Sequence, residues 1–79
     1  MKKVYSFNTK YGDVLALIEP KKVKKFGRYF LEGRIPKGST TNDWAKSRKA
    51  FILLETITDF IIFESEKEYF LAMENSTQE

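Results

Sequence analysis

Residues 3–18, KVYSFNTKYGDVLALI, decide the fold class of this chain. The first part of the stretch alternates, with Tyr5 and Phe7 on one face, which is the two-residue period of a β-strand. Gly12 follows in a position that suits a tight turn, because glycine tolerates positive φ. Val14–Ile18 is a continuous apolar run, which is typical of a strand covered on both faces. The stretch therefore predicts a β-hairpin of two antiparallel strands.

Two prolines frame the middle of the chain. We expect Pro20 to end the second strand, and the segment Pro20–Gly27, PKKVKKFG, to form a connection. Arg28–Ile35 predicts a third strand, which Pro36 closes. Gly33 interrupts that strand and indicates a bulge or a close approach of two backbones.

The two faces of the third strand differ in character. The apolar residues on one face, which we expect to point to the core, are Tyr29, Leu31 and Ile35. The residues on the opposite face are Arg28, Phe30, Glu32 and Arg34. A large aromatic ring between two arginines on an outer face has the arrangement of a stacking platform for bases. In the alternative interpretation, the C-terminal helix covers Phe30 and the ring belongs to the core.

Residues 43–57 leave two alternatives open. They follow a polar loop, Lys37–Asp43, and their first residue is able to cap a helix. The apolar residues at helical spacing are Ala50, Leu53, Leu54 and Ile57. Aromatic and β-branched residues favour a strand from Lys49 to Thr56 instead, and we favour the strand. A further strand is expected at Phe60–Phe63.

A helix is expected at the C-terminal end. Residues 65–68, SEKE, have the form of a capping box, with Ser65 at the N-cap and Glu68 three positions later. The helix should run over residues 66–75 and dock on the sheet, because a helix this short is marginal alone. The residues of its docking face are Tyr69, Phe70 and Met73. Residues 76–79 are expected to form a disordered tail.

Together these elements predict an α+β fold in one domain of residues 1–75. The fold is a small, strongly bent antiparallel sheet of four to five strands with a C-terminal helix. The bend leaves open a barrel-like outline, similar to that of small basic barrel proteins that coat or bend nucleic acid. An exposed edge strand, for which the first strand is a candidate, offers a place where another copy could pair. We therefore expect a monomer or a small homo-oligomer.

The charge of the chain is divided along its length. Residues 1–50 hold thirteen of the fourteen Lys and Arg residues and four acids, a net charge of +9. Residues 51–79 hold one Lys and seven acids, a net charge of −6. An asymmetry of this size predicts an anionic partner for the basic half. The acids either meet a basic protein or neutralise the lysines within the fold.

The chain has no Cys and no His, which excludes several classes of site. Zinc fingers need thiolate and imidazole ligands, and many nucleophilic enzymes need a His base or a Cys nucleophile. Asp13, Glu19 and Lys21 match a short pattern of metal-dependent nucleases, but Pro20 interrupts the strand that such a site needs. We expect no enzymatic activity, no metal and no cofactor.

The strongest candidate for a binding site begins in the Lys-rich segment that follows Pro20. Phosphates attract dense positive charge, and bases stack on flat aromatic rings. Both chemistries meet here, since lysines and aromatic residues are interleaved. The predicted contact residues are Lys21, Lys22, Lys24, Lys25, Phe26, Arg28, Phe30 and Arg34. A Lys-rich turn is also commonly a solvated loop without a partner.

A second basic segment lies beside Trp44 and contains Lys46, Arg48 and Lys49. In one interpretation it extends the same basic surface. In the other it is solvated, and Trp44 packs on the edge of the core.

Two classes of function fit these observations. The first is a small non-enzymatic protein whose basic half contacts DNA or RNA through the Lys-rich loop and flanking aromatics. The alternative is a regulator or inhibitor of the kind that phages and mobile elements encode. Such a protein binds a target with an acidic surface, for example an enzyme that handles nucleic acid. No apolar run approaches a membrane span, so we expect a cytoplasmic protein without a membrane partner, in the host cytoplasm if a phage encodes it.

Overall fold

A computed structural model describes residues 2–77 and shows a five-stranded antiparallel sheet with one C-terminal helix. Two short 3₁₀ turns, η1 and η2, complete the described elements. In chain order the elements are β1 (Val4–Thr9), β2 (Val14–Lys25), β3 (Arg28–Arg34), η1 (Thr41–Asp43), β4 (Lys49–Leu53), η2 (Leu54–Thr56), β5 (Ile57–Phe63) and α1 (Glu66–Thr77). The predicted α+β class is confirmed.

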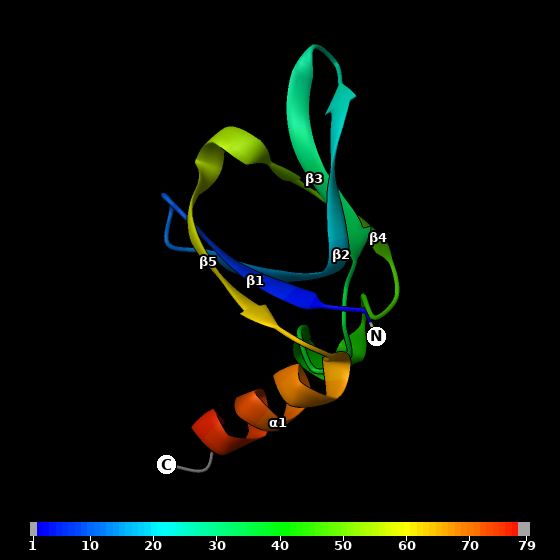
Figure 1. Ribbon diagram of the computed structural model, residues 1–79, viewed down its shortest axis with the longest axis vertical. Helices are drawn as coiled ribbons and strands as arrows, with labels where there is room; N and C mark the ends of the chain where they lie inside the picture. Colours follow the sequence, from blue (N-terminus) through cyan, green and yellow to red (C-terminus); the bar gives the residue numbers. More distant parts are fainter. Residues whose placement is uncertain (1, 78–79) are drawn as a thin grey trace.

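The sheet is bent but open. Its strand order is β4-β3-β2-β1-β5, and every neighbouring pair is antiparallel. The edge strands β4 and β5 are consecutive in the chain and are joined by η2, which swings the chain from one edge to the other (Figure 1). They are not hydrogen-bonded to each other, so the sheet does not close into a barrel. The first strand was a candidate edge, and this expectation is wrong because β1 lies between β2 and β5.

Residues on both faces of β1 and of the first half of β2 are buried, among them Ala16 and Leu17. The expected cover of Val14–Ile18 does not extend to Val14, which is 65% exposed. On the inner face of the bent sheet, Phe7 and Leu17 join a core cluster with residues from beyond β3 and from β4. On the other face, Val4 and Ala16 pack against Tyr69 of α1. Because the side chains of a strand alternate, one apolar run supplies both clusters. The sheet is therefore the middle layer of the molecule.

β2 does not end at Pro20, as expected, but continues to Lys25. The ladder with β3 shifts between Ile18 and Lys21, where two β2 residues stand opposite one on β3. This is a β-bulge, and it accommodates Pro20, which has no N–H to give to the ladder. Glu19 in the bulge has a φ of 44°, in the left-handed region. The expected connection Pro20–Gly27 is thus mostly strand.

Gly33 was predicted to mark a bulge or a close approach of two backbones, and both are found. Gly33 lies opposite the bulge in β2. A Cβ atom at this position would lie 2.9 Å from the Cβ of Leu17 and 3.0 Å from the carbonyl oxygen of Ile18. Real Cβ atoms do not approach that closely, so only glycine lets β3 cross the bent part of β2.

The segment with two alternatives forms a strand rather than a helix. β4 pairs with β3 from Lys49 to Leu53, and η2 then replaces the rest of the expected strand to Thr56. Ile52 of β4 is buried in the inner cluster. Tertiary pairing with β3 decides between the two local alternatives.

α1 begins as predicted, at a cap made by Ser65. The Ser65 hydroxyl oxygen accepts the amide of Glu68 at 3.1 Å. The Glu68 carboxylate accepts the amide of Glu64 at 2.7 Å, one residue before the amide that a standard capping box satisfies. The helix ends at Thr77, so the expected tail 76–79 begins inside it, and its last two residues lie outside the described part of the chain.

Tyr69 is the main anchor of α1. It is 5% exposed, and its ring lies 5.3 Å from that of Phe63 in an edge-to-face contact. Met73 packs against the same cluster. Phe70 was expected to dock on the sheet, but its ring lies against the loop after β3, beside Gly38 and 5.4 Å from the Lys37 Nζ. The helix therefore contacts two separate parts of the molecule.

We predict that Tyr69→Ala destabilises the protein by about 3–5 kcal/mol, because it removes a buried aromatic ring from the cluster beneath α1. Leu71→Ala is the matched control, since Leu71 is 48% exposed on the same helix and its loss should stay within about 0.5 kcal/mol. Urea unfolding followed by circular dichroism measures both. Equal losses in the two variants would contradict the assigned docking face.

Candidate functional site

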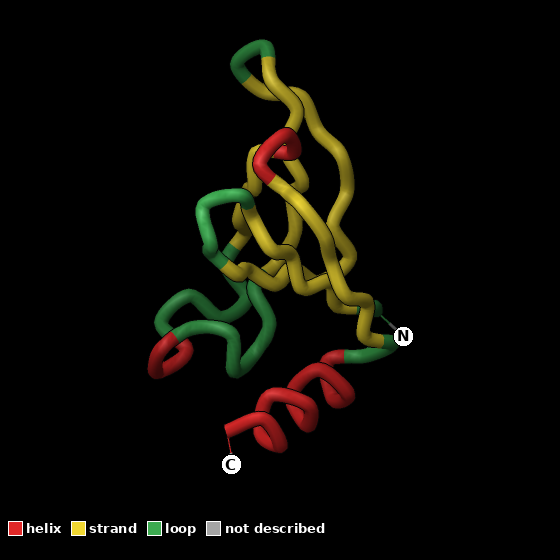
Figure 2. The backbone as a smooth tube through the Cα atoms, turned by 90° about the vertical axis from the view of Figure 1, so that its left-hand side faces the viewer, coloured by secondary structure: helices red, strands yellow, loops and turns green. Residues whose placement is uncertain are grey.

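The β2–β3 hairpin projects from one end of an elongated molecule. The principal extents are 42 × 25 × 23 Å, and the hairpin tip and α1 lie at opposite ends of the long axis (Figure 1). β4 pairs with β3 only as far as Phe30, so residues 24–29 extend beyond the end of β4. Figure 2 shows the same hairpin rising above the rest of the sheet. Its tip is accessible from several sides.

The tip is a two-residue turn formed by Phe26 and Gly27. Both residues have positive φ, 54° and 76°, which is the geometry of a type I′ turn. Such turns favour Asn-Gly, Asp-Gly or Gly-Gly, because a left-handed conformation costs an ordinary side chain roughly 1–2 kcal/mol. Phe26 is nevertheless 97% exposed. A strained, solvent-exposed aromatic residue brings no packing energy to the fold, and such residues cluster at functional sites.

Positive side chains occupy both faces of the hairpin. Lys22 and Lys24 share the inner face with Tyr29, and their Nζ atoms lie 4.5 Å and 5.7 Å from its ring centroid. On the outer face, the Nζ of Lys25 lies 5.2 Å from the ring of Phe51 on β4. By the alternation of side chains along the strands, the outer face also carries Lys21, Val23 and Arg28. The ribbon thus presents cations and aromatic rings together on each side.

Little negative charge reaches the tip. Lys22, Lys24 and Lys25 form no ion pair within the part of the chain that the structure describes. Arg28 pairs with Glu55 of η2. The expectation that C-terminal acids neutralise the lysine cluster therefore holds only for Arg28. Most of those acids lie on or near α1, at the other end of the molecule (Figure 1).

Phe30 lies on the outer face, as predicted from the alternation. Its ring meets that of Phe51 edge to face, with centroids 6.4 Å apart. It is half-buried and belongs to neither core cluster. The alternative that α1 covers Phe30 is wrong, because α1 packs over β1, β2 and β5.

The base of the hairpin holds a mixed cluster around Glu32. The Glu32 carboxylate lies 3.8 Å from the Nζ of Lys21 and 4.0 Å from that of Lys49. Beside it, the guanidinium of Arg34 donates a hydrogen bond of 3.1 Å to the carbonyl of Ser47, which fixes the loop before β4. The structure therefore brings Lys49 and Arg34 to the hairpin base, with one acid between the cations.

Lys46 and Arg48 are exposed on the loop between β3 and β4. This loop lies at the helix end of the molecule, away from the hairpin tip (Figure 1). Trp44 in the same loop is 77% exposed, so the expectation that it packs on the core edge is wrong. Its neighbour Ala45 is the buried residue. The second basic segment is thus divided: Lys49 joins the hairpin, and the loop residues do not.

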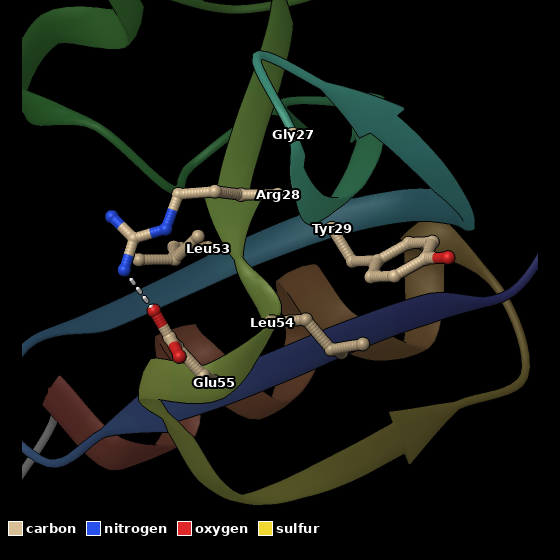
Figure 3. Close-up of a pocket in the computed structure, with 6 residues that line it drawn as sticks. All are labelled: Gly27, Arg28, Tyr29, Leu53, Leu54 and Glu55. Atoms are coloured by element: carbon tan, nitrogen blue, oxygen red, sulfur yellow. Dashed lines mark hydrogen bonds and ion pairs between the residues drawn. The ribbon is translucent and has the colours of Figure 1, made fainter.

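A shallow hollow of about 310 Å³ adjoins the tip, where β4 ends and β3 continues (Figure 3). Tyr29, Leu53 and Leu54 give it apolar walls. The Arg28–Glu55 ion pair lies along one side and offers both donors and acceptors (Figure 3). The sequence did not single out Leu53, Leu54 or Glu55 for this role, because their neighbours in space are more than twenty positions away in the chain.

β5 is an edge strand with an unusually apolar surface. Phe60, Ile61 and Ile62 are 51%, 56% and 44% exposed. Its one acid, Asp59, accepts hydrogen bonds from Thr58 at 2.8 Å and from the side chain of Asn8 at 3.0 Å. These hydrogen bonds stabilise the carboxylate and lower the pKa of Asp59 below its ordinary value. Strand edges of this kind are available for pairing with another chain.

The nuclease-like pattern does not form a site. Asp13 precedes β2 and Glu19 lies in the bulge, so six residue-to-residue steps of about 3.4 Å along the strand separate them by up to ~20 Å. Within residues 2–77 no group of three acidic residues is placed to hold a metal ion. No helix among these residues is long and apolar enough to cross a membrane.

The chain was compared with protein-family models, with curated proteins and with solved structures. None of the three comparisons found a significant match. The function is therefore inferred from the geometry and charge of the β2–β3 hairpin.

We predict that Phe26→Asn stabilises the protein. The change creates Asn-Gly, the pair that type I′ turns favour, and relieves roughly 1 kcal/mol of backbone strain. For a domain of this size the melting temperature should rise by about 4–8 °C. Tyr11→Asn is the matched control, since Tyr11 is a 72% exposed aromatic residue in the β1–β2 turn without positive φ. A lower melting temperature for Phe26→Asn would assign Phe26 a structural role.

Proposed function

We propose that this protein is a non-enzymatic nucleic-acid-binding protein and that the β2–β3 hairpin is its contact surface. One observation carries the proposal. The projecting hairpin combines three lysines that have no ion-pair partner in the described chain with two exposed aromatic rings. The lysines are Lys22, Lys24 and Lys25, and the rings are those of Phe26 and Tyr29.

The lysines supply the affinity in this proposal. Each ammonium group that replaces a condensed cation on a phosphate backbone releases that cation to the solvent, which favours binding at low salt. Acids would weaken this effect, and the chain holds most of its C-terminal acids at the opposite end of the molecule (Figure 1). The resulting charge separation also orients the protein, hairpin first, toward a polyanion.

The aromatic rings and the hollow supply contacts to bases. Tyr29 is 47% exposed and forms one wall of the hollow, with two lysine ammonium groups near its ring. A base stacked on this ring would place its phosphate close to Lys22 and Lys24. Stacking of this kind is worth about 1–3 kcal/mol per base and depends little on sequence.

We predict that changing Lys21, Lys22, Lys24 and Lys25 together to Gln flattens the salt dependence of binding. If all four contact phosphates, the slope of log affinity against log salt should fall in magnitude by about 3–4. Fluorescence anisotropy at several salt concentrations measures the slope with single-stranded DNA, duplex DNA and RNA. The melting temperature should change little, because surface ion pairs contribute about 0–1 kcal/mol.

The matched control changes four lysines away from the hairpin to Gln: Lys3, Lys10, Lys37 and Lys67. It lowers the net charge equally, so it should leave most of the slope intact. Equal slopes in the two variants would mean that net charge, not the hairpin, drives binding. Absence of binding to every nucleic acid at low salt would refute the proposal.

The alternative function is binding of a protein target, as a regulator or inhibitor. The exposed β5 edge favours it, because an extended segment of a partner can add a strand there and bury Phe60 and Ile62. In that case the lysine hairpin guides an acidic target by charge, and the four-Gln variant should slow association more than it speeds dissociation.

A further inference from the structure

The side chain of Phe26 has no ring or cation partner among residues 2–77. It is 97% exposed, and its ring contacts no other aromatic ring or cation among the described residues. Its backbone lies in the left-handed region, which disfavours Phe. Phe26 belongs to the two-residue turn that joins β2 to β3, and this tip lies at the end of the molecule opposite α1 (Figure 1). These facts indicate a role outside the protein.

The distribution of charge around Phe26 indicates which form of nucleic acid the hairpin meets. Lys22 and Lys24 lie on one face of the ribbon, and Lys25 lies on the other, beside Arg28, which is paired with Glu55. A single strand has one phosphate backbone and needs cations on one side only. A ribbon that lies in a duplex groove has a phosphate backbone on each side, so cations on both faces fit a duplex.

The hairpin also has the dimensions that a DNA groove requires. Two residue pairs, Lys24–Tyr29 and Lys25–Arg28, extend beyond the end of β4. At about 3.4 Å per residue they project ~7 Å, before the turn and the Phe26 ring are counted. The grooves of B-DNA are about 7.5–8.5 Å deep, and the major groove admits a two-stranded ribbon. The major groove of duplex RNA is too narrow for side chains to read, which favours DNA.

We propose that Phe26 is a wedge that inserts between neighbouring base pairs of duplex DNA and kinks the duplex. Apolar side chains inserted in this way partly unstack a base step, and the bend brings more phosphate toward the protein. The lysines on the two faces hold the flanking backbones while the ring separates the bases. This inference rests on the proposed function, and it assigns that function a duplex substrate and a mechanical effect.

The test is energy transfer between dyes at the two ends of a short duplex that contains flexible TA steps, which kink readily. The wild-type protein should raise the transfer efficiency by bringing the ends together. Phe26→Ala and Phe26→Asn should lose this increase and bind the duplex roughly ten-fold more weakly, while keeping the salt slope. Phe26→Leu should retain the bend, since Leu also acts as a wedge. Tyr11→Ala is the control for loss of an exposed aromatic residue.

The outcomes separate the two proposals. Binding with an unchanged dye distance, or a bend that survives in Phe26→Ala, overturns the wedge and leaves nucleic-acid binding in place. Tighter binding to single-stranded DNA, reduced equally by Phe26→Ala, also overturns the wedge and assigns Phe26 to base stacking. Binding to vesicles of anionic phosphatidylglycerol through Phe26, without binding to any nucleic acid, overturns both proposals.

Discussion

The close crossing of β2 and β3 at Gly33 is the constraint on which the rest of the structure depends. Two residues of β2, Glu19 and Pro20, stand opposite this one glycine, and the strand bends there. The first half of β2 lies between the two core clusters, with Leu17 buried in one and Ala16 in the other. The second half leaves the core as the projecting ribbon. A single bulge therefore lets one strand stabilise the core at one end and, in the proposed function, contact nucleic acid at the other.

The distribution of charge follows the same division. Buried apolar contacts and the capped helix lie at one end, where Val4, Leu17 and Tyr69 are almost inaccessible to solvent. At the other end the chain places like charges close together and a phenylalanine in an unfavourable conformation. Each of these features costs stability in the free protein. In the proposed function, a partner of opposite charge relieves the repulsion, and stacking of its rings compensates for the strain.

The sequence predicts the elements whose signals are local. The β1–β2 hairpin, the burial of Ala16 and Leu17 on opposite faces and the Ser65 cap all follow from period or from residues within one turn. The prediction that Pro20 ends the second strand was wrong. Proline usually ends a central strand, and only the pairing with β3 shows that a bulge accommodates it. The exposure of Trp44 could likewise not be predicted from the sequence, because it depends on where η1 places the loop.

For the candidate site, composition identified the lysines but not their geometry. A Phe-Gly turn is not a usual type I′ signature, so the sequence predicted a loop where the chain forms a ribbon with two faces. The hollow beside Tyr29 depends on η2, which follows β3 by some twenty residues and turns back toward it. Long-range placement of this kind leaves no local pattern. The sequence could therefore single out the basic and aromatic residues of the candidate site, but it could not predict how they are grouped in space.

The pairing of β1 with β5 has a consequence for how the protein is made. These strands are separated by more than forty residues, and β5 leaves the ribosome after the other four strands of the sheet. Until then β1 is an unprotected edge, with Tyr5 and Phe7 lacking the Phe60 ring that later packs beside them. Pairing between strands this far apart in the sequence slows folding. It also lengthens the time during synthesis for which an aggregation-prone strand edge is unpaired. The nascent chain is therefore most vulnerable to misassembly just before β5 emerges.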